Sequence, residues 1–591
     1  MISTGNEYIA IPEIRPNSDV LSINVLSMGQ RGMIEFRGGN KPFLSLGLLI
    51  DGNKVILSER NQDRYWIPVF GSENETHEVR SIILAPRDQK GFVQRVSVRN
   101  NGEKALSVAL QLDGSIGEIL HTVNESKRFE GSLHAYRTAW SECPCFDIRS
   151  GFPVLAIAPI CSGPSTWTYT EGKAITFSMH ASFAVEAGAE QSFSIYWGVG
   201  YEEVSAVTMA RELSRQGFDA LLSGTRSYLD SIIRTSGDDR LDKCLFRNLI
   251  FSIYYATGKT IDTEELVLVT SRSPRYYVSA AYWDRDALLW SFPAILEVDE
   301  QLAREMLFYV STRQKKNVGI HSRYIDGTIL EPGFELDELC APILAIEAYR
   351  IKTGEPILDD GDIISLIERI IQKLLAVETE IGLYETFLQP TDDMHVYPLL
   401  TYDNALVYSV FSILTTWDWK GKKALWQQKR EHVKQAIETY QVKDHEGKKQ
   451  YVWSVDLQGN YDIYDEPPGS LLLLPLFGIA SPADETYMHT VSKITDPAYK
   501  YSFAGTKYSA IGCPHAPHPW ILSLANSVRV SHDEDALEKL LSAPMDHGIA
   551  CESIDEHTGY SKTGEAFATC AGYLSYVLIG ELKKRDTWKT H

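Results

Sequence analysis

Four segments of the chain concentrate carboxylates beside arginine, histidine or aromatic residues. They are Tyr282–Asp286, Phe334–Glu338, Gln389–His395 and Cys551–His557. In the first, Arg285 and Asp286 can bind vicinal hydroxyls of a sugar while the ring of Trp283 packs on the sugar face. In the third, Asp392 and Asp393 are adjacent, and burying them together would raise the pKa of one enough for it to act as a general acid.

Each segment also has an ordinary structural interpretation. Asp286 and the acids of Phe334–Glu338 precede apolar helical stretches, where carboxylates cap a helix or interact favourably with its dipole. The Asp392–Asp393 pair fits a turn, and Cys551–His557 fits an exposed acidic loop. Taken together, the four segments predict a polar mouth lined with aromatic residues, at which acids from distant loops converge.

Other kinds of chemistry find little support in the sequence. His515 and His518 are close in the chain, but Pro517 and Pro519 argue against a helical metal-binding face. There is no HExxH motif, no GxSxG nucleophile elbow and no Gly-rich phosphate loop. We therefore expect no metal and no cofactor.

The elements that position these segments differ between the two parts of the chain. Residues 1–225 contain short alternating or β-branched runs such as Asp19–Leu26 and Val79–Leu84, separated by turn signals such as Asn101-Gly102. This pattern predicts an antiparallel β-sandwich. Near Tyr201–Leu229 the period changes from 2 to 3.6, which predicts a linker helix.

Residues 235–591 have helical periodicity, as in Glu335–Ile351, Ile363–Leu375 and Glu565–Leu582. Roughly ten to twelve helices are expected, and the polar clusters fall in the loops between them. Two concentric rings of helices explain this arrangement better than a bundle does. The predicted fold is a β-sandwich followed by an (α/α)6 barrel that holds the candidate site.

Composition narrows the class of protein further. The 591 residues include 57 Lys+Arg and 78 Asp+Glu, a formal net charge of −21, which argues against a nucleic-acid partner. The longest notable apolar run, Leu471–Leu474, is far shorter than a membrane span. With no secretory signal recognised and eight scattered cysteines, we expect a cytoplasmic protein with reduced thiols.

Six blocks of the helical part resemble, in the same order, segments of the metal-independent exo-α-mannosidases of glycoside hydrolase family 125. The blocks are WDRDALLWSFPAIL (283–296), FELDELCAPILAIEAYRIKTGE (334–355), PTDD (390–393), PGSLLLLPLFG (468–478), AIGCPH (510–515) and CES (551–553). The β-domain lies outside this resemblance, and its place ahead of a helical barrel is similar to that in bacterial glucoamylase-like proteins. Glu338 stands where the family has serine, and the segments after Asp393 and Glu552 also differ from those of the family. These differences affect the expected specificity for mannose more than the expected hydrolytic reaction.

The resemblance implies hydrolysis of a terminal α-linked mannose from an oligosaccharide or glycoside, with inversion and without a metal; an α-1,6 linkage is one candidate. The implied acid belongs to the pair Asp392 and Asp393, with Asp393 favoured, and the implied base is Glu552. The implied substrate-binding residues are Trp283, Arg285, Asp286, Asp337 and His515. Two alternatives stay open: a glucoamylase-like α-glucosidase or other exo-α-glycosidase on the same barrel, and a non-catalytic carbohydrate-binding protein. The oligomeric state is open.

Overall fold

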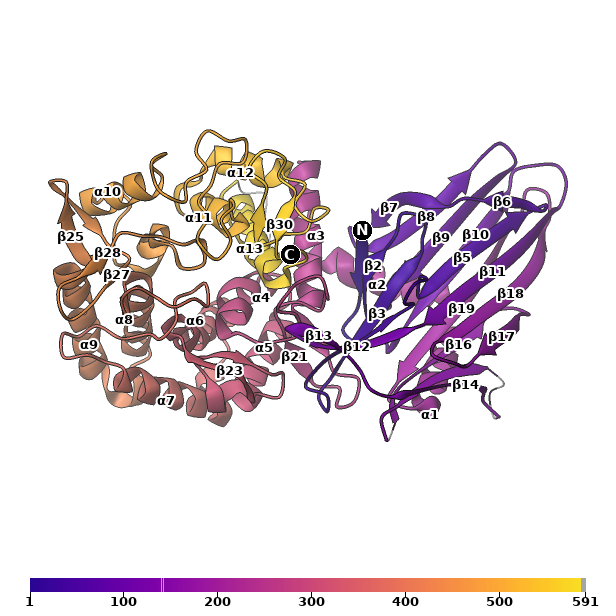
Figure 1. Ribbon diagram of the computed structural model, residues 1–591, viewed down its shortest axis with the longest axis horizontal. Helices are drawn as coiled ribbons and strands as arrows, with labels where there is room; N and C mark the ends of the chain where they lie inside the picture. The colour runs from indigo at the N-terminus through magenta and orange to yellow at the C-terminus, as the bar shows by residue number, and fades with distance from the viewer. Residues whose placement is uncertain (140, 142, 152, 586–591) are drawn as a thin grey trace. The chain divides into compact units, whose positions relative to one another are not determined.

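The computed structural model describes residues 1–139, 141, 143–151 and 153–585 (Figure 1). The chain forms two compact units. Unit 1 is Met1–Arg234, Thr257–Val267 and Arg272–Ala280, and unit 2 is Thr235–Ala256, Leu268–Ser271 and Ala281–His591. The last six residues of the predicted helical range 235–591 lie outside the described residues.

Unit 1 contains two antiparallel sheets. The first has the order β13 (Glu125–Arg128), β12 (Glu118–Val123), β4 (Gly32–Arg37), β3 (Val20–Ser27), β5 (Leu44–Ile50), β11 (Leu106–Ile116), β18 (Ile175–Val185), β17 (Thr166–Thr170). In addition, β2 (Ala10–Ile14) pairs with β3, β1 (Ile2–Gly5) pairs with β2, and β6 (Asn53–Val55) pairs with β5. The second has the order β14 (Ser132–Arg137), β15 (Pro144–Arg149), β16 (Pro153–Cys161), β19 (Glu190–Gly200), β10 (Gly91–Asn100), β9 (His77–Leu84), β8 (Ile67–Glu73), β7 (Ser58–Asp63).

The facing sides of these sheets form one hydrophobic core, as alternating strands require. Phe146 of the second sheet stacks on Phe177 of the first, with ring centroids 4.4 Å apart. Trp197 is fully buried beside them. The predicted β-sandwich is therefore confirmed.

Two helices, rather than one linker helix, follow the sandwich strands. They are α1 (Glu203–Gln216) and α2 (Phe218–Ile232). Gly217 separates them with a φ of 80°, a left-handed value that glycine adopts without the penalty of a side chain. Ala206 and Val207 of α1 pack on Ala156 and Ala158 of β16.

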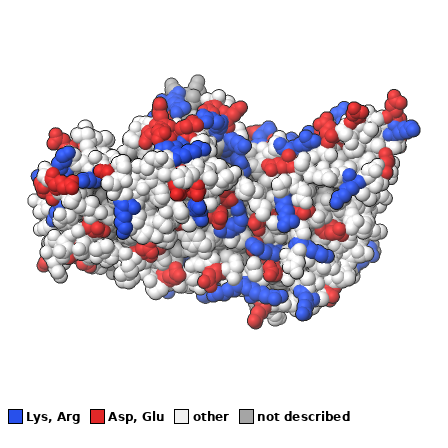
Figure 2. Space-filling model, turned by 45° about the horizontal axis from the view of Figure 1, so that its top comes forward, with Lys and Arg blue, Asp and Glu red and all other residues white. Residues whose placement is uncertain are grey.

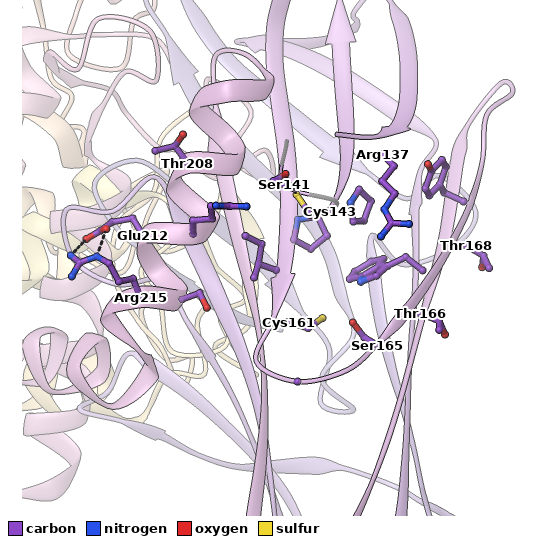
Figure 3. Close-up of a pocket in the computed structure, with 18 residues that line it drawn as sticks. Arg137, Ser141, Cys143, Cys161, Ser165, Thr166, Thr168, Thr208, Glu212 and Arg215 are labelled. Carbon is purple, nitrogen blue, oxygen red and sulfur yellow. Dashed lines mark hydrogen bonds and ion pairs between the residues drawn. The ribbon is translucent and has the colours of Figure 1, made fainter. Parts of the chain in front are cut away.

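A cleft of about 1320 Å³ opens at one edge of the sandwich (Figure 3). The edge strand β17 contributes Thr166 and Thr168, β16 contributes Cys161, and α1 contributes Glu212 and Arg215. Glu212 and Arg215 form an ion pair with each other on this wall. The two sheets thus pack closely over their middle and diverge at this edge.

Unit 2 alternates inner and outer helical segments. Within the described residues the inner segments are η1 (Arg285–Ser291) continuing as α4 (Phe292–Leu296), α6 (Leu336–Thr353), α8 (Thr401–Thr416), η8 (Leu471–Phe477), α11 (Ile521–Ser531) and α13 (Ala568–Lys584). The outer ones are α3 (Asp239–Tyr255), α5 (Glu300–Tyr309), α7 (Gly361–Ala376), α9 (Lys423–Ala436), α10 (Glu485–Ile494) and α12 (Glu534–Ser542).

The inner segments form a closed ring. Each contacts the next in chain order, and α13 returns to contact η1. Because an outer helix runs back between successive inner ones, the inner segments share one direction and their N-termini meet at one end. This is the predicted (α/α)6 barrel, which is confirmed. None of the helices in the described part of the chain combines the length and apolar character that a membrane span needs.

Candidate active site

The loops that enter the inner segments carry the site. They contain Trp283–Asp286 before and within η1, Glu335–Glu338 at the start of α6, Asp392–Asp393 ahead of α8, Asp465–Glu466 ahead of η8, His515 ahead of α11 and Glu552 ahead of α13. The carboxylates that the sequence brings forward therefore gather at the N-terminal ends of the inner ring. Helix N-termini favour negative charge, so this end of the barrel tolerates many buried acids.

Arg285 is the centre of this cluster. Its side chain is only 2% exposed. One guanidinium nitrogen lies 2.7 Å from Glu335 and 3.1 Å from Asp337, and the other binds Asp392. Burial opposes the charge, but the surrounding carboxylates outweigh it and raise the pKa of Arg285 well above its usual range. Arg285 thus joins three loops of the ring.

Glu338 fixes the loop that carries Arg285. Its carboxyl accepts hydrogen bonds from the backbone N–H groups of Asp284 and Arg285, the latter at 3.0 Å. Burial raises the pKa of Glu338 well above its usual range. Glu338 therefore has a structural role, because its side chain bonds the backbone of the neighbouring loop.

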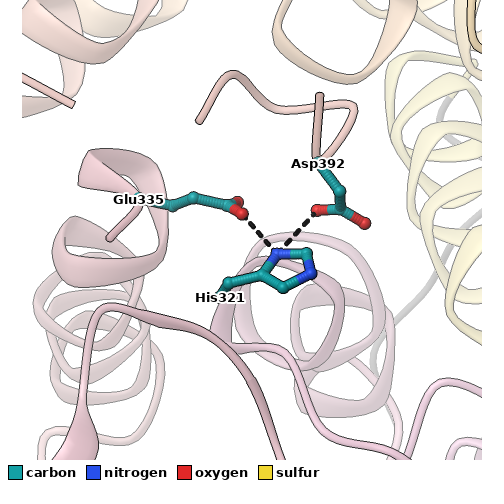
Figure 4. Close-up of side chains that lie close together, drawn as sticks. All are labelled: His321, Glu335 and Asp392. Atoms are coloured by element: carbon teal, nitrogen blue, oxygen red, sulfur yellow. Dashed lines mark hydrogen bonds and ion pairs between the residues drawn. The ribbon is translucent and has the colours of Figure 1, made fainter. Parts of the chain in front are cut away.

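His321 lies against the same carboxylates (Figure 4). Its Nδ1 is 2.5 Å from Glu335 and 3.5 Å from Asp392, and its Nε2 is 3.3 Å from Glu331. Although burial lowers it, the pKa of His321 rises to about 9 through the bond to Glu335 and the charge of Asp392. His321 is therefore a cation at neutral pH.

His321, Glu335 and Asp392 are close enough together to hold a metal ion. The donor set fits poorly, because a metal needs a neutral imidazole and free carboxylate oxygens. Here the imidazole is charged, and Arg285 already binds both carboxylates. The cluster is held together by ion pairs, and a metal ion would have to displace both the proton of His321 and the guanidinium of Arg285.

The adjacent aspartates occupy a tight turn spanning Leu388–Met394. Asp392 N–H donates to Gln389 at 2.8 Å, and Gln389 N–H donates back to the carbonyl of Asp393 at 2.9 Å. Asp392 has a φ of 66°, in the left-handed region of backbone conformation that residues other than glycine adopt uncommonly. This turn directs the two carboxylates to different partners: Asp392 binds Arg285, whereas Asp393 faces His515.

His515 stands between the other two carboxylates of interest. Its Nδ1 lies 3.1 Å from Asp393, and its Nε2 lies 3.7 Å from Glu552. The hydrogen bond to Asp393 raises the pKa of His515 to about 9. The side chain of Asp393 is 47% exposed and that of Glu552 only 4%. One imidazole ring therefore separates an accessible carboxylate from a buried one.

The remaining predicted residues lie nearby but are buried. Trp283 is 2% exposed and meets the ring of His321 edge-on, with centroids 5.5 Å apart. Asp286 accepts a hydrogen bond of 2.7 Å from Thr569, and burial raises its pKa to about 7. Asp337 binds Arg285. The structure thus brings together all eight predicted site residues.

Glu466 belongs to the site and was not predicted from the sequence. It is fully buried and accepts hydrogen bonds from the N–H and the hydroxyl of Thr391, each at 3.0 Å, and from Tyr464 at 3.2 Å. Burial raises the pKa of Glu466 to about 8. It holds the residue that immediately precedes Asp392.

Comparison with known proteins agrees with this geometry. The sequence model of the metal-independent alpha-mannosidases (GH125) matches residues 373–579, which contain four of the six resembling blocks. No curated protein matches the chain. A metal-independent alpha mannosidase from Streptococcus pneumoniae, in a non-productive complex with alpha-1,6-mannobiose, is similar with a TM-score of 0.53 and 20% identity, covering 61% of this chain and 97% of that one.

A bacterial glucoamylase complexed with acarbose is similar with a TM-score of 0.61 and 12% identity, covering 97% of this chain and 93% of that one. At 20% and 12% identity, the two solved structures support the fold alone. The family match covers the loops that carry Asp393, His515 and Glu552. The resemblance seen in the sequence is confirmed over residues 373–579, and the matches support a glycoside hydrolase.

Proposed function

We propose that the protein is an inverting, exo-acting α-mannosidase that removes a terminal α-linked mannose from an oligosaccharide. The observation that carries this proposal is that His515 lies between Asp393 and Glu552 at the mouth of the barrel. All three residues belong to the stretch that matches the mannosidase family. An inverting glycosidase needs two carboxyl groups about 6.5–9.5 Å apart, so that water fits between sugar and base. Separation by one imidazole ring is compatible with that spacing.

In the proposed reaction, the protonated form of Asp393 donates a proton to the glycosidic oxygen as the bond from that oxygen to the anomeric carbon breaks. Glu552 removes a proton from a water molecule, whose oxygen attacks the anomeric carbon from the opposite face. The products are the sugar with inverted configuration and the shortened alcohol. Asp393 is the proposed acid because it is exposed to an incoming substrate, whereas Asp392 is held by Arg285.

The proposed substrate is a neutral sugar bound at a carboxylate-rich mouth. Carboxylates accept hydrogen bonds from sugar hydroxyls without requiring a charge on the ligand. Asp393 and the imidazolium of His515 are the accessible polar groups nearest the reacting bond. Arg285, His321 and Glu338 hold the loops in place beneath them.

The test is a product assay on α-1,6-, α-1,3- and α-1,2-linked mannobiosides and the matching glucobiosides, with NMR of the anomer first released. Release of β-mannose from an α-mannoside is the expected result. Release of α-mannose would overturn inversion, and release of glucose alone would identify the α-glucosidase alternative. Binding of these sugars without hydrolysis of any of them would identify a non-catalytic carbohydrate-binding protein.

A further inference from the structure

A second cavity lies between the inner segments of the barrel. Its volume is about 180 Å³. Its walls include Tyr402 and Leu522 near the starts of α8 and α11, Ala348 of α6, Arg529 in the last turn of α11 and Tyr576 of α13. None of the described residues that line it is a carboxylate of the candidate site, Arg285 or His515, and the proposed reaction gives this cavity no role.

Most of the cavity wall is aromatic or aliphatic. The rings of Trp290, Phe292, Tyr402, Phe477 and Tyr573 contribute, together with several leucines. An apolar cavity of roughly 150 Å³ in another protein stays dry and takes up benzene. A cavity of this size and lining therefore has room for a molecule with one aromatic ring or a body of similar size.

Arg529 is the one charged residue that lines this cavity, and it has no acidic partner. No carboxylate of the described residues forms an ion pair with it; the groups that act on its charge are the phenols of Tyr402, Tyr573 and Tyr576. One guanidinium nitrogen donates to the hydroxyl of Tyr573 at 3.2 Å, and the guanidinium lies 5.1 Å from the ring centroid of Tyr576. Arg285 and Arg323, which are also in the barrel, are by contrast paired with carboxylates.

Other interactions than ion pairs stabilise this cation in the apolar wall. The C-terminus of α11 carries the negative end of a helix dipole, and cation–π contacts to tyrosines are favourable. Neither replaces the two-point hydrogen bonding by which a guanidinium binds a carboxylate.

We propose that this cavity binds a small organic acid, whose ring-sized apolar body fills the space and whose carboxylate pairs with Arg529. The positive charge of Arg529 favours an anionic ligand, and the apolar residues around it favour a ligand whose remaining part is apolar. The cavity shares none of its lining residues with the proposed catalytic pair, so the proposal does not depend on which glycoside the enzyme hydrolyses.

Benzoate is a suitable probe, with benzyl alcohol as its neutral counterpart. With the full-length protein, we expect benzoate to raise the melting temperature in a saturable manner and to give a binding isotherm by calorimetry. Benzyl alcohol should bind more weakly by about tenfold or more, because it lacks the charge-assisted hydrogen bonds. Equal binding of the two compounds would overturn the assignment of an anion site.

Two variants test the location. Arg529→Met should weaken benzoate binding by about tenfold or more, while Arg430→Met on the outer helix α9 should leave it unchanged. If Arg529→Met does not fold, Ala348→Leu keeps the arginine but fills the cavity, and it should prevent binding. Unchanged benzoate affinity in Ala348→Leu, or no binding to the natural sequence at up to roughly 10 mM benzoate, would overturn the proposal.

Discussion

At the scale of single residues, two neighbouring aspartates acquire different roles from their partners. Asp392 binds the buried Arg285, which holds it as part of the ion-pair network. Asp393 faces His515 and remains accessible. The left-handed backbone at Asp392 makes this divergence possible, because it turns successive side chains away from each other.

The first prediction concerns the two proposed catalytic carboxyls. Asp393→Asn and Glu552→Gln should each lower turnover by about 10²-fold or more, because each removes an acid or a base while preserving shape. Initial rates on the best α-mannoside will measure this. Asp444→Asn, an exposed residue of the β25 hairpin (Val442–His445), is the matched control. Turnover within twofold of the natural sequence in either variant would contradict the assignment.

The second prediction concerns pH. The pKa of His515 is raised to about 9 by its bond to Asp393, so its charge is present at neutral pH and is lost as pH rises through 9. Turnover should therefore decline across that interval. His515→Gln should be roughly tenfold slower at pH 7, since a charge-assisted hydrogen bond is lost. Its decline near pH 9 should be smaller than that of the natural sequence but not absent, because His321 also has a pKa of about 9; a variant that keeps the full alkaline decline would show that another group causes it.

Residue types and order were enough to select residues that the structure brings together, because the acids among them stand beside arginine, histidine or tryptophan in short blocks. Glu466 escaped prediction because its neighbours in the chain are ordinary loop residues. Its partner, Thr391, lies 75 positions away. The available signal was indirect: the block PGSLLLLPLFG begins only two residues after Glu466. His321 was missed for the same reason, since its partners come from other loops.

At the scale of elements, the turn at Leu388–Met394 depends on an anchor from another loop. The third prediction tests that anchor. Glu466→Ala removes three hydrogen bonds to Thr391 and Tyr464 and should lower kcat by roughly tenfold or more while changing KM less. Glu466→Gln can keep these bonds as a protonated glutamate does, so it should retain most activity.

Equal losses in both Glu466 variants would contradict the assigned role, because glutamine can keep the hydrogen bonds that alanine removes. A full loss of structure in Glu466→Ala is excluded by comparing circular dichroism and melting curves with those of Glu466→Gln.

The fourth prediction concerns Arg285, which joins η1, α6 and the turn at Leu388–Met394. Arg285→Met leaves several buried carboxylates without their cation and should destabilise the barrel by about 3–5 kcal/mol at neutral pH. In the variant, the folded-state pKa values of Glu335 and Glu338 rise further above their unfolded values. The folded state then binds more protons, so the deficit should shrink as pH falls from about 8 to 5.

Urea unfolding of the barrel at several pH values will measure this dependence. Glu335→Gln in the Arg285→Met background should recover part of the lost stability at pH 8, because it removes one of the repelling charges. A deficit that is independent of pH would indicate lost packing rather than unpaired carboxylates.

Element boundaries followed the hydrophobic period where that period is regular. The predicted strand Asp19–Leu26 is β3 (Val20–Ser27), and the predicted helix Ile363–Leu375 lies within α7 (Gly361–Ala376). The inner segment η8 was not predicted as helical. Its sequence LLLLPLF is apolar at every position and contains Pro475, so it has no 3.6-residue period to detect.

At the scale of the whole molecule, the formal charge of −21 overstates the negative charge at neutral pH. Glu466, with a pKa of about 8, carries a proton, and burial raises the pKa values of Glu338 and Asp403 well above their usual range. His321 and His515, with pKa values of about 9, add positive charge. On the face in Figure 2, lysine and arginine are interspersed with aspartate and glutamate. Part of the acidic excess is therefore inside the barrel.

The two compact units each enclose their own buried residues, which leads to a prediction about unfolding. Phe146 belongs to the sandwich core and Leu578 of α13 is fully buried in the barrel. Phe146→Ala and Leu578→Ala should each cost about 2–5 kcal/mol through lost packing. Because neither side chain belongs to the other core, calorimetry should resolve two transitions, with each substitution lowering only one. Phe146→Ala should also retain glycosidase turnover below its own transition, since every proposed site residue lies in unit 2. If both substitutions lowered one shared transition, the units would unfold as a single cooperative body, and the sandwich would then contribute directly to the stability of the barrel that holds the site.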